Sequence, residues 1–464
     1  MRVAHLPVVL LSLATTASAL PAQEITRALV GATLIDGTGD PAVSDAVVVI
    51  RAGRIECAGS RTECAVPAGA EVSDLRDRWL IPGLVDAHVH YSQTGWADGR
   101  PDAYDARDRF PYERTVARLK DPTPFFRSYL CSGVTATFDV GGFPWTWALR
   151  DSAVGEADRP HVAAAGPLLS TRDHWLNVPA ERQFIHMATD SATMAGARYL
   201  IENRTDAIKV WFLASSQMQD TVAVVRQLGI AGRMAREAGI PLIVHATNLW
   251  AAKQAARAGA KLLVHGVADA PVDEEFIRLL REAGTVYTPT LVVGDGYRQL
   301  RARDFRAEDY DLACVDPATR AKAFLTDSLA GAPPAETVAR VAEAAARGRA
   351  LESANTLALH RAGVPVAAGT DAGNPLTLHG PAIFLEMEAL AAAGLTPLEV
   401  IAAATRNGAL AMGRLDEFGT VESGKVADLV VLDADPLSDI TNLRRIRAVV
   451  RAGELLPREE LVWP

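Results

Sequence analysis

Six ionisable residues each interrupt a short apolar stretch of this 464-residue sequence. They are two closely spaced histidines, a lysine, two further histidines and an aspartate, namely His88, His90, Lys209, His245, His265 and Asp371. Imidazole and carboxylate groups are the ligands that zinc, manganese, iron and cobalt ions bind in proteins. If the fold brings these side chains together, they predict a metal site.

Each of the six residues also has an ordinary explanation when it is considered alone. His245 or His265 could be a satisfied core histidine. Asp371 could belong to a turn, and Lys209 could extend its amine to solvent. However, four of the ten histidines of the chain belong to this set, and a buried charge or unpaired imidazole costs stability. The joint pattern therefore favours a metal site over six unrelated residues.

His88 and His90 lie two positions apart in the stretch GLVDAHVHYS, residues 83–92. Residues two apart on a β-strand face the same way, so both imidazoles can point to one site. By itself a histidine pair of this kind is a weak motif. Its meaning depends on the elements that carry the other four residues.

Eight short apolar segments alternate with longer stretches rich in Ala, Arg and Glu between residues 83 and 413. The segments cover residues 83–91, 133–141, 160–170, 207–214, 241–248, 261–267, 285–293 and 364–373. Eight strand–helix units in one run predict an α/β fold, a (β/α)8 TIM barrel, in which the carboxyl ends of the strands meet on one face. A doubly wound open sheet is the alternative, but no GxGxxG motif follows the first strand. Residues 294–350 carry no strand candidate and are expected to form a largely helical insertion.

Both ends of the chain, beyond the first residues, are rich in Val, Ile and Thr, with Gly, Pro and Asp between the apolar runs. This pattern predicts a small β-sandwich domain built from both chain ends. The expected boundaries are residues 23–82 and 414–464 for the β-domain and residues 83–413 for the catalytic barrel.

Residues 1–22 contain an early arginine, an apolar run and a series of small residues. This order predicts a secretory signal peptide, so the mature protein is expected to be exported, without a membrane anchor. The formal net charge is −9 and no basic cluster is present, so a nucleic-acid partner is not expected.

The four cysteines fall into two groups by their spacing. Cys57 and Cys64 lie on either side of a Gly-Ser turn, and in an oxidising compartment they are expected to form a local disulfide. Cys131 and Cys314 lie far apart in unrelated contexts, and both are expected to be free. No CxxC or zinc-knuckle spacing is present in the sequence.

The six ionisable residues, taken in strand order, resemble the ligand set of the amidohydrolase superfamily. Longer stretches extend the resemblance to nearly the whole mature chain. They are WLIPGLVDAHVH, GVTATFD, GLTPLEVIAAATRNGALAMG and GTVESGKVADLVVLDADPL. The first resembles the entry to the barrel of this superfamily, and the last two resemble its exit into the accessory β-domain.

The resemblance implies a centre of two divalent metal ions, with zinc the expected ion. His88, His90 and Asp371 would hold the more buried ion, and the two later histidines would hold the more exposed one. Lys209 would bridge the ions as a carbamate formed with CO2. The metals would lower the pKa of a bridging water and polarise the scissile carbonyl, and Asp371 would pass the proton to the leaving amine.

Within the superfamily, the sequence is most similar to the branch of Xaa-Pro dipeptidases and imidazolonepropionase. In dipeptidase-like relatives a histidine after the third strand contacts the substrate carbonyl, and His174 is the corresponding candidate. Asn248 stands where these relatives often have a tyrosine, which puts recognition of a prolyl dipeptide in question. Weaker candidates for substrate binding are Arg172, Asn248, Tyr287 and His379, with Trp96, Thr290 and Asp139 as further neighbours of the site.

Together these features predict an exported enzyme that hydrolyses an amide or peptide C–N bond of a small molecule, such as a dipeptide or an N-acyl amino acid. One alternative is a one-metal hydrolase of a cyclic amide or amidine, similar to imidazolonepropionase. Another is an exported binding protein without catalytic activity. The sequence leaves open whether the chain forms a homo-oligomer.

Overall fold

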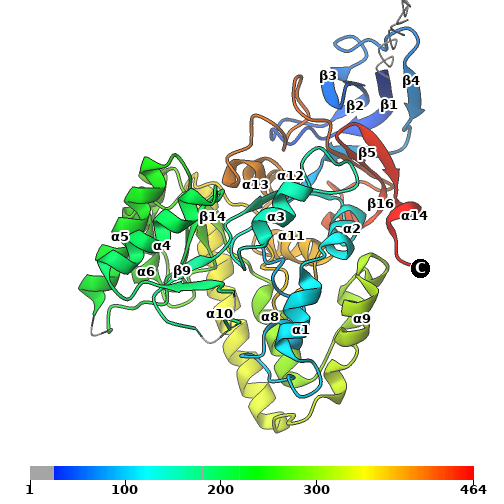
Figure 1. Cartoon of the computed structure of the whole chain (residues 1–464). Coiled ribbons are helices and arrows are strands. Elements are labelled where there is room, and N and C mark those ends of the chain that lie inside the picture. Colours follow the sequence, from blue (N-terminus) through cyan, green and yellow to red (C-terminus); the bar gives the residue numbers. More distant parts are fainter. Residues whose placement is uncertain (1–25, 175, 179–180, 219) are drawn as a thin grey trace, which may run out of the picture.

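The computed structural model describes residues 26–174, 176–178, 181–218 and 220–464, which form a β-rich unit and a larger α/β unit (Figure 1). The predicted signal peptide, residues 1–22, lies outside the described residues. In Figure 1 the first strands, coloured blue, and the last strands, coloured red, lie at the same end of the molecule. Among the described residues, no helix is long and apolar enough to cross a membrane.

The β-rich unit contains, in the described part of the chain, one eight-stranded sheet to which both chain ends contribute. Its order is β17-β16-β15-β5-β1-β2-β3, and β4 also pairs with β1. The strands are β1 (Thr26–Leu34), β2 (Val43–Arg51), β3 (Arg54–Ser60), β4 (Glu71–Asp74), β5 (Trp79–Pro82), β15 (Leu429–Leu432), β16 (Ile446–Arg451) and β17 (Glu454–Pro457).

The sequence predicted a sandwich, but the strands join in one branching sheet. Strand β1 is the point at which this sheet branches. Its first half pairs with β4 and its last two residues pair with β5. Alternate residues of β2 face opposite sides, so Val48 and Ile50 belong to one apolar cluster and Val47 and Val49 to another. Both faces of the sheet are therefore buried at β2.

Nine short strands form two parallel sheets in the described part of the larger unit. The first sheet has the order β6-β7-β8, and the second has the order β10-β9-β11-β12-β13-β14. The strands are β6 (Leu84–Val89), β7 (Val134–Asp139), β8 (His161–Ala164), β9 (Leu168–Ser170), β10 (Phe184–His186), β11 (Ile208–Trp211), β12 (Leu242–His245), β13 (Leu262–Val264) and β14 (Val286–Thr288).

Seven of the eight predicted strand segments contain a strand. The third segment, residues 160–170, is divided into β8 and β9. The eighth segment, residues 364–373, makes only isolated parallel bridges, at Val366 with β14 and at Ala372 with β6. The segment lies between the two sheets and links them through these bridges. The parallel strands therefore do not form one continuous eight-stranded ladder.

Two residues explain why the eighth segment is not a regular strand. Asp371 has a left-handed backbone (φ 61), which interrupts the extended conformation. Gly369 packs so closely that an added Cβ would lie 2.5 Å from Cγ2 of Thr288 and 2.9 Å from Cβ of His88. Only glycine permits this approach to both neighbouring strands.

The helices follow and separate the strands. They are α1 (Tyr112–Leu119), α2 (Thr123–Cys131), α3 (Thr146–Ser152), α4 (Asp190–Glu202), α5 (Thr221–Glu237), α6 (Leu249–Arg257), α7 (Glu274–Ala283), α8 (Val293–Ala302), α9 (Pro317–Ala323), α10 (Ala335–Arg361), α11 (Ala382–Ala392), α12 (Pro397–Ala403), α13 (Arg406–Ala411) and α14 (Arg458–Leu461). Helix α12 begins at a capping box formed by Thr396 and Glu399. The expected helical insertion, residues 294–350, contains most of α8, all of α9 and the first part of α10, with no strand.

Two disulfides join the four cysteines. Cys57 and Cys64 are bonded, as the sequence predicted. Cys131 and Cys314 are also bonded, so the prediction that both are free is wrong. They lie at the end of α2 and in a short turn of the insertion, and both are buried. The two cysteines are 183 residues apart in the sequence and meet only because the insertion packs against α2. The sequence alone therefore does not indicate this contact.

Candidate metal centre and active site

A cavity of about 270 Å³ lies at the carboxyl ends of the parallel strands. All six ionisable residues singled out in the sequence line it. The other walls come from the loop after β6, from the region of β9 to β11 and from α8, and include Arg100, Phe184, Trp211, Tyr297 and Asn374. The fold therefore brings the predicted ligand set together in one place.

His88, His90 and Asp371 place three potential ligand atoms at the corners of a small triangle. Nε2 of His88 and Nε2 of His90 lie 3.3 Å apart. These atoms lie 3.2 and 3.0 Å, respectively, from Oδ1 of Asp371. Two ligands of a tetrahedral zinc ion, each at about 2.0–2.1 Å, are separated by about 3.3 Å. The triangle therefore fits three ligands of one metal ion.

The second nitrogen of His90 fixes the ring in a metal-binding state. Its Nδ1–H donates to the carbonyl oxygen of Gly141 over 2.6 Å, which turns Nε2 towards the other potential ligand atoms. Asp139 supports this arrangement, because its carboxylate accepts from the N–H groups of Gly141 and Tyr91, each over 3.0 Å. The sequence suggested Asp139 as a neighbour of the site. In the structure its support for His90 is indirect, because Asp139 binds the backbone around the ring.

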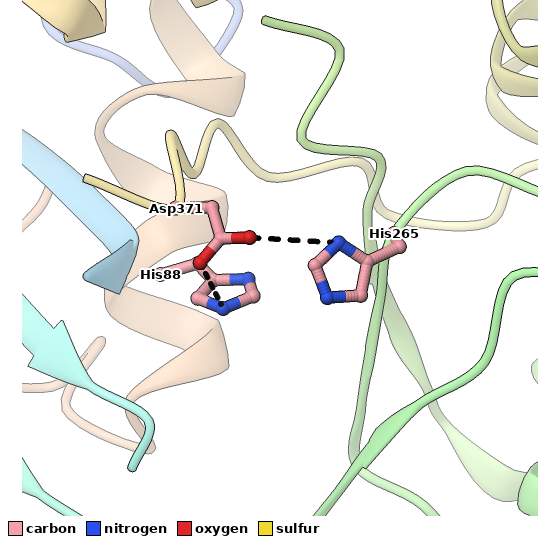
Figure 2. Close-up of side chains that lie close together, drawn as sticks. All are labelled: His88, His265 and Asp371. Atoms are coloured by element: carbon pink, nitrogen blue, oxygen red, sulfur yellow. Dashed lines mark ion pairs between the residues drawn. The ribbon is translucent and has the colours of Figure 1, made fainter. Parts of the chain in front are cut away.

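His265 and His245 lie on the other side of Asp371. The ligand atoms of His88, His265 and Asp371 all lie within 4.8 Å of one another. Figure 2 shows the imidazole of His265 facing Oδ2 of Asp371, with Nδ1 3.9 Å from that oxygen. The ring of His245 lies 4.3 Å from the ring of His265, measured between centroids. A second pair of imidazoles therefore stands beside the first group.

Three residues of this site have left-handed backbone conformations: His265 (φ 78), Thr290 (φ 50) and Asp371 (φ 61). Each such residue costs on the order of 1–3 kcal/mol, and the β-branched threonine is the least expected among them. Oγ1 of Thr290 lies 2.8 Å from Nδ1 of His265, so the two strained residues hold one another. Backbone strain of this kind is concentrated at functional sites, where the surrounding structure holds side chains in a required geometry.

Burial controls the charges of the site. Lys209 is 2% exposed, and burial lowers its pKa to about 7 although nearby carboxylates act in the opposite direction. Burial also lowers the pKa of His245 to about 3, with Lys209 adding to the shift. For Asp371, burial would raise the pKa, but the two imidazoles of the HxH pair keep it well below its usual value. An anionic carboxylate among neutral imidazoles is the protonation state that binds metal.

The remaining wall of the cavity is cationic and aromatic. Arg100, in the loop after β6, donates from Nε and Nη2 to the two oxygens of Asp102 over 2.8 and 2.7 Å. The guanidinium carbon lies 5.7 Å from the ring centroid of Tyr297, on α8. Phe184 and Trp211 line the cavity with ring centroids 5.1 Å apart. This part of the cavity suits an anionic group next to an apolar one.

A sequence model of the amidohydrolase family matches residues 79–456. The chain belongs to the amidohydrolase family. Members of this family hydrolyse carbon–nitrogen bonds and generally bind metal, so the ligand set described above has the chemistry that the family requires. The amidohydrolase is 26% identical over 459 residues to an imidazolonepropionase from Methylobacterium sp. (strain 4-46), in a match that covers 91% of this chain and 97% of that protein.

Solved structures share the fold of the amidohydrolase. A Xaa-Pro dipeptidase crystallised with methionine in its active site superimposes with a TM-score of 0.71 and 23% identity, over 93% of this chain and 100% of that one. Ochratoxinase from A. niger superimposes with a TM-score of 0.68 and 20% identity, over 94% and 96% of the two chains. At these identities the similarity concerns the fold alone.

Two predicted substrate contacts of the amidohydrolase, Arg172 and His174, are not among the residues that line the cavity. Arg172 is exposed. The ring of His174 lies 5.2 Å from that of Trp211, and its Nε2 lies 4.0 Å from Oδ2 of Asp102. His174 therefore lies just behind the cavity wall, while Arg100 occupies the cationic position that the sequence assigned to Arg172.

Asn248, Tyr287 and Trp96 have structural roles in the amidohydrolase and do not line the cavity. Asn248 caps α6 by accepting from the N–H of the third helical residue over 2.9 Å. The hydroxyl of Tyr287 accepts from a backbone N–H in the loop after β13 over 3.0 Å. Nε1 of the fully buried Trp96 donates to a threonine of the insertion over 3.0 Å. Each polar group already has a partner away from the metal centre.

His379, another predicted substrate contact, lies in an aromatic cluster outside the cavity. Its Nε2–H donates to the carbonyl oxygen of Gln93 over 2.9 Å, so its Nδ1 accepts from the hydroxyl of Tyr129 over 2.8 Å. Its ring stacks on Phe125 with centroids 4.0 Å apart. Burial lowers the pKa of His379 to about 4, which keeps the ring neutral at pH 7.

The neutral state of His379 predicts a pH dependence of stability. Its pKa is about 4 in the folded protein and 6.5 in the unfolded chain, so below pH 6.5 unfolding takes up a proton and stability falls as the pH approaches 4. Between pH 7 and pH 5 this contribution is about 2 kcal/mol. Urea denaturation of metal-free protein should therefore show that His379→Phe loses about 2 kcal/mol less than wild type over this interval.

Comparing the two pH values within each protein cancels the cost of the hydrogen bonds that the His379→Phe variant lacks. Equal losses of unfolding free energy in variant and wild type would show that this ring does not stay neutral in the folded protein.

Arg100, Tyr297 and Asn374 were not predicted from the sequence. Arg100 belongs to the long loop after β6, and nothing in the composition of this loop distinguishes it from the other arginines there. Tyr297 belongs to the insertion, whose position relative to the site has no signature in the sequence. Asn374 follows Asp371 by three residues, and this spacing is the only available signal.

Proposed function

We propose that this amidohydrolase cleaves the amide bond of a small substrate that carries a carboxylate, such as a dipeptide or an N-acyl amino acid. The observation that supports the proposal is a single cavity in which six potential metal-binding side chains and the guanidinium of Arg100 lie together. The relatives agree with this class, since one is named a Xaa-Pro dipeptidase and another an imidazolonepropionase. Both names denote enzymes that act on small molecules.

We assign the metal centre to two divalent ions, with zinc the expected ion. His88, His90 and Asp371 would hold one ion, because their ligand atoms fit its coordination distances. His245 and His265 would hold the second. When bound, such ions supply a water of lowered pKa and polarise the carbonyl of the substrate.

Lys209 would bridge the two ions as a carbamate formed with CO2. Its amine is buried, and within the described residues it makes no hydrogen bond and no ion pair shorter than 4.0 Å. A buried amine without a partner is costly, whereas a carbamate presents two anionic oxygens to neighbouring cations. Extra density on Nζ of Lys209 in a crystal structure of metal-loaded protein would demonstrate the modification.

Asp371 would move the proton of the reaction. Its Oδ1 faces the two imidazoles of the HxH pair, and its Oδ2 faces His265 across the centre of the cavity. A carboxylate in this position can accept a proton from the attacking water and deliver it to the leaving amine. The contact of His174 to the substrate carbonyl stays a prediction, because His174 packs against Trp211 of the cavity wall but does not itself line the cavity.

Arg100 would bind the carboxylate of the substrate. Its guanidinium has five N–H groups; two of these bind Asp102 and one binds Asn374. The two others, one on each terminal nitrogen, remain for a ligand in the cavity. Phe184 and Trp211 would contact an apolar side chain of the same substrate.

Two wider proposals accompany this function. The first is that the two parallel sheets and the linking segment 364–373 form one (β/α)8 barrel, which is supported by bridges from that segment to β6 and to β14. The second is that the protein is exported. Two disulfides are typical of an oxidising compartment, which agrees with the signal peptide predicted for residues 1–22.

A one-metal hydrolase of a cyclic amide is the second candidate, favoured by the imidazolonepropionase relatives. The metal content of active protein separates the two candidates. Two ions per chain support the proposed centre, whereas full activity with one ion per chain would favour the second candidate.

The test of the proposed substrate class compares paired substrates with full-length, metal-loaded protein. N-acetyl amino acids with apolar side chains are supplied as free acids and as C-terminal carboxamides, and acetate release is measured. We expect kcat/KM to be higher for the acids, and Arg100→Ala to reduce this preference by about 10- to 100-fold, the value of a hydrogen bond to a charged group.

Arg107→Ala is the matched control. Arg107 belongs to the same loop and pairs with Asp105 as Arg100 pairs with Asp102, but it is exposed and is not among the residues that line the cavity. It should keep the preference for acids. An unchanged preference in Arg100→Ala, or no hydrolysis of any acid by wild type, would contradict the proposed substrate class.

A further inference from the structure

The side chain of Asn374 is the direct neighbour of Asp371 within the site. Asn374 is 3% exposed, and it lines the same cavity. Its Nδ2 donates to Oδ1 of Asp371 over 2.7 Å and to the carbonyl oxygen of the same residue over 3.1 Å. One amide group therefore holds both the carboxylate and the backbone of Asp371.

Two donors fix the amide of Asn374 from the other side. Its Oδ1 accepts from the hydroxyl of Tyr297 over 2.7 Å and from Nη1 of Arg100. All four hydrogen-bonding positions of the amide are thus used. A flipped amide would set its NH2 group against the guanidinium and its oxygen against two oxygens of Asp371, so only one orientation satisfies the network.

The backbone of Asp371 needs this support. Its left-handed conformation (φ 61) is strained, and on one side its N–H donates to the carbonyl oxygen of His88 over 2.7 Å. The bond from Asn374 to the carbonyl of Asp371 closes the turn from the opposite side. Without it, the carbonyl of Asp371 would keep the longer bond from the backbone N–H of Asn374, over 3.3 Å, as its hold on this side of the turn.

The direction of the carboxylate also depends on Asn374. Oδ1 of Asp371 receives the amide N–H and lies within 3.2 Å of both HxH imidazoles. Oδ2 receives no hydrogen bond from Asn374 and faces His265. The amide of Asn374 therefore binds only Oδ1 of the carboxylate. Oδ2 points towards the centre of the cavity.

We propose that Asn374 is a positioning residue of the reaction, which orients the carboxylate of Asp371, and that Tyr297 acts through it by holding its amide. This inference rests on the proposed hydrolytic function, because it assigns a way to position the group that moves the proton. It also makes the insertion, through Tyr297 on α8, a part of the catalytic arrangement.

The first test is kinetic and uses full-length, metal-loaded protein with the N-acetyl amino acid that wild type cleaves best. Asn374→Ala should lower kcat by about 10- to 100-fold, as losses of supporting contacts around metal ligands do, with KM changed much less. Tyr297→Phe, which removes one hydroxyl, should lower kcat by a smaller factor. In the Asn374→Ala background, Tyr297→Phe should have almost no further effect on kcat.

Asn407→Ala is the matched control, because Asn407 is a buried asparagine that donates to the backbone of Val366 at the start of the same segment. It should leave kcat unchanged. Independent, multiplicative effects of the Asn374 and Tyr297 substitutions would overturn the proposal. So would a Tyr297→Phe variant with a raised KM and unchanged kcat, because Tyr297 would then contact the substrate. If Asn374→Ala does not fold, Tyr297→Phe decides alone by the same KM-against-kcat criterion.

The second test is structural and does not depend on activity. In a crystal structure of Asn374→Ala, the side chain of Asp371 should leave its wild-type rotamer or occupy more than one. A single, unchanged position of Asp371 would overturn the positioning role even if the variant were slow. If wild type cleaves no amide, the proposed function fails, and this structure still decides the role of Asn374.

Discussion

Replacement of Asp371 by asparagine is expected to lower kcat by about 10³-fold, within the range that a positioned proton-transfer group contributes. Asparagine keeps the shape of the side chain but cannot accept the proton. It also removes the negative charge that faces the imidazoles at 3.0 and 3.2 Å. The measurement is steady-state hydrolysis at saturating metal, with metal content determined on the same samples.

Asp206→Asn is the matched control for this prediction. Asp206 precedes β11, is not among the residues that line the cavity, and accepts from the N–H of Ala164 over 2.8 Å. Its replacement should not change kcat. If Asp371→Asn retained metal and turned over at more than a tenth of the wild-type rate, Asp371 would not be the group that moves the proton.

The second large effect is expected for the disulfide between Cys131 and Cys314. Replacing both residues by alanine should lower the free energy of unfolding by about 4–5 kcal/mol, because the bond closes a very long loop in the unfolded chain. The sequence separation is 183 residues for this pair and 7 for Cys57 and Cys64. Chemical denaturation of the two double variants measures the difference.

The Cys57→Ala and Cys64→Ala double variant is the control. Its shorter loop predicts a loss of about 2 kcal/mol. Both losses should disappear when wild type and variants are compared under reducing conditions. Equal losses for the two pairs would show that loop length does not determine the contribution of these disulfides.

Much of the fold could be predicted because it depends on local patterns. Short apolar runs between helical stretches located seven of the eight strand segments, and the runs rich in Val, Ile and Thr at both chain ends located the β-rich unit. The six ionisable residues could be predicted as a set because each interrupts a run that would otherwise be apolar. Their positions at strand ends then required that they meet.

The features that could not be predicted depend on contacts between distant segments. The bond between Cys131 and Cys314 forms because the insertion packs on α2, and no local pattern records this packing. The eighth segment has the composition of a strand, but the left-handed backbone of Asp371 removes it from the ladder. The predicted substrate residues Tyr287 and His379 are polar groups near strand ends that already have partners in the core.

The division of the cavity wall between two kinds of segment has a consequence for evolution and engineering. The potential metal ligands lie in or directly after the parallel strands or in the linking segment 364–373, whereas Arg100 and Tyr297 lie in the loop after β6 and on α8. We expect variation in these two segments, at positions other than Tyr297, to change substrate preference while the hydrolytic chemistry stays intact. A library restricted to the loop and to α8, with Tyr297 kept, would be a compact search space for retargeting this enzyme to new amides.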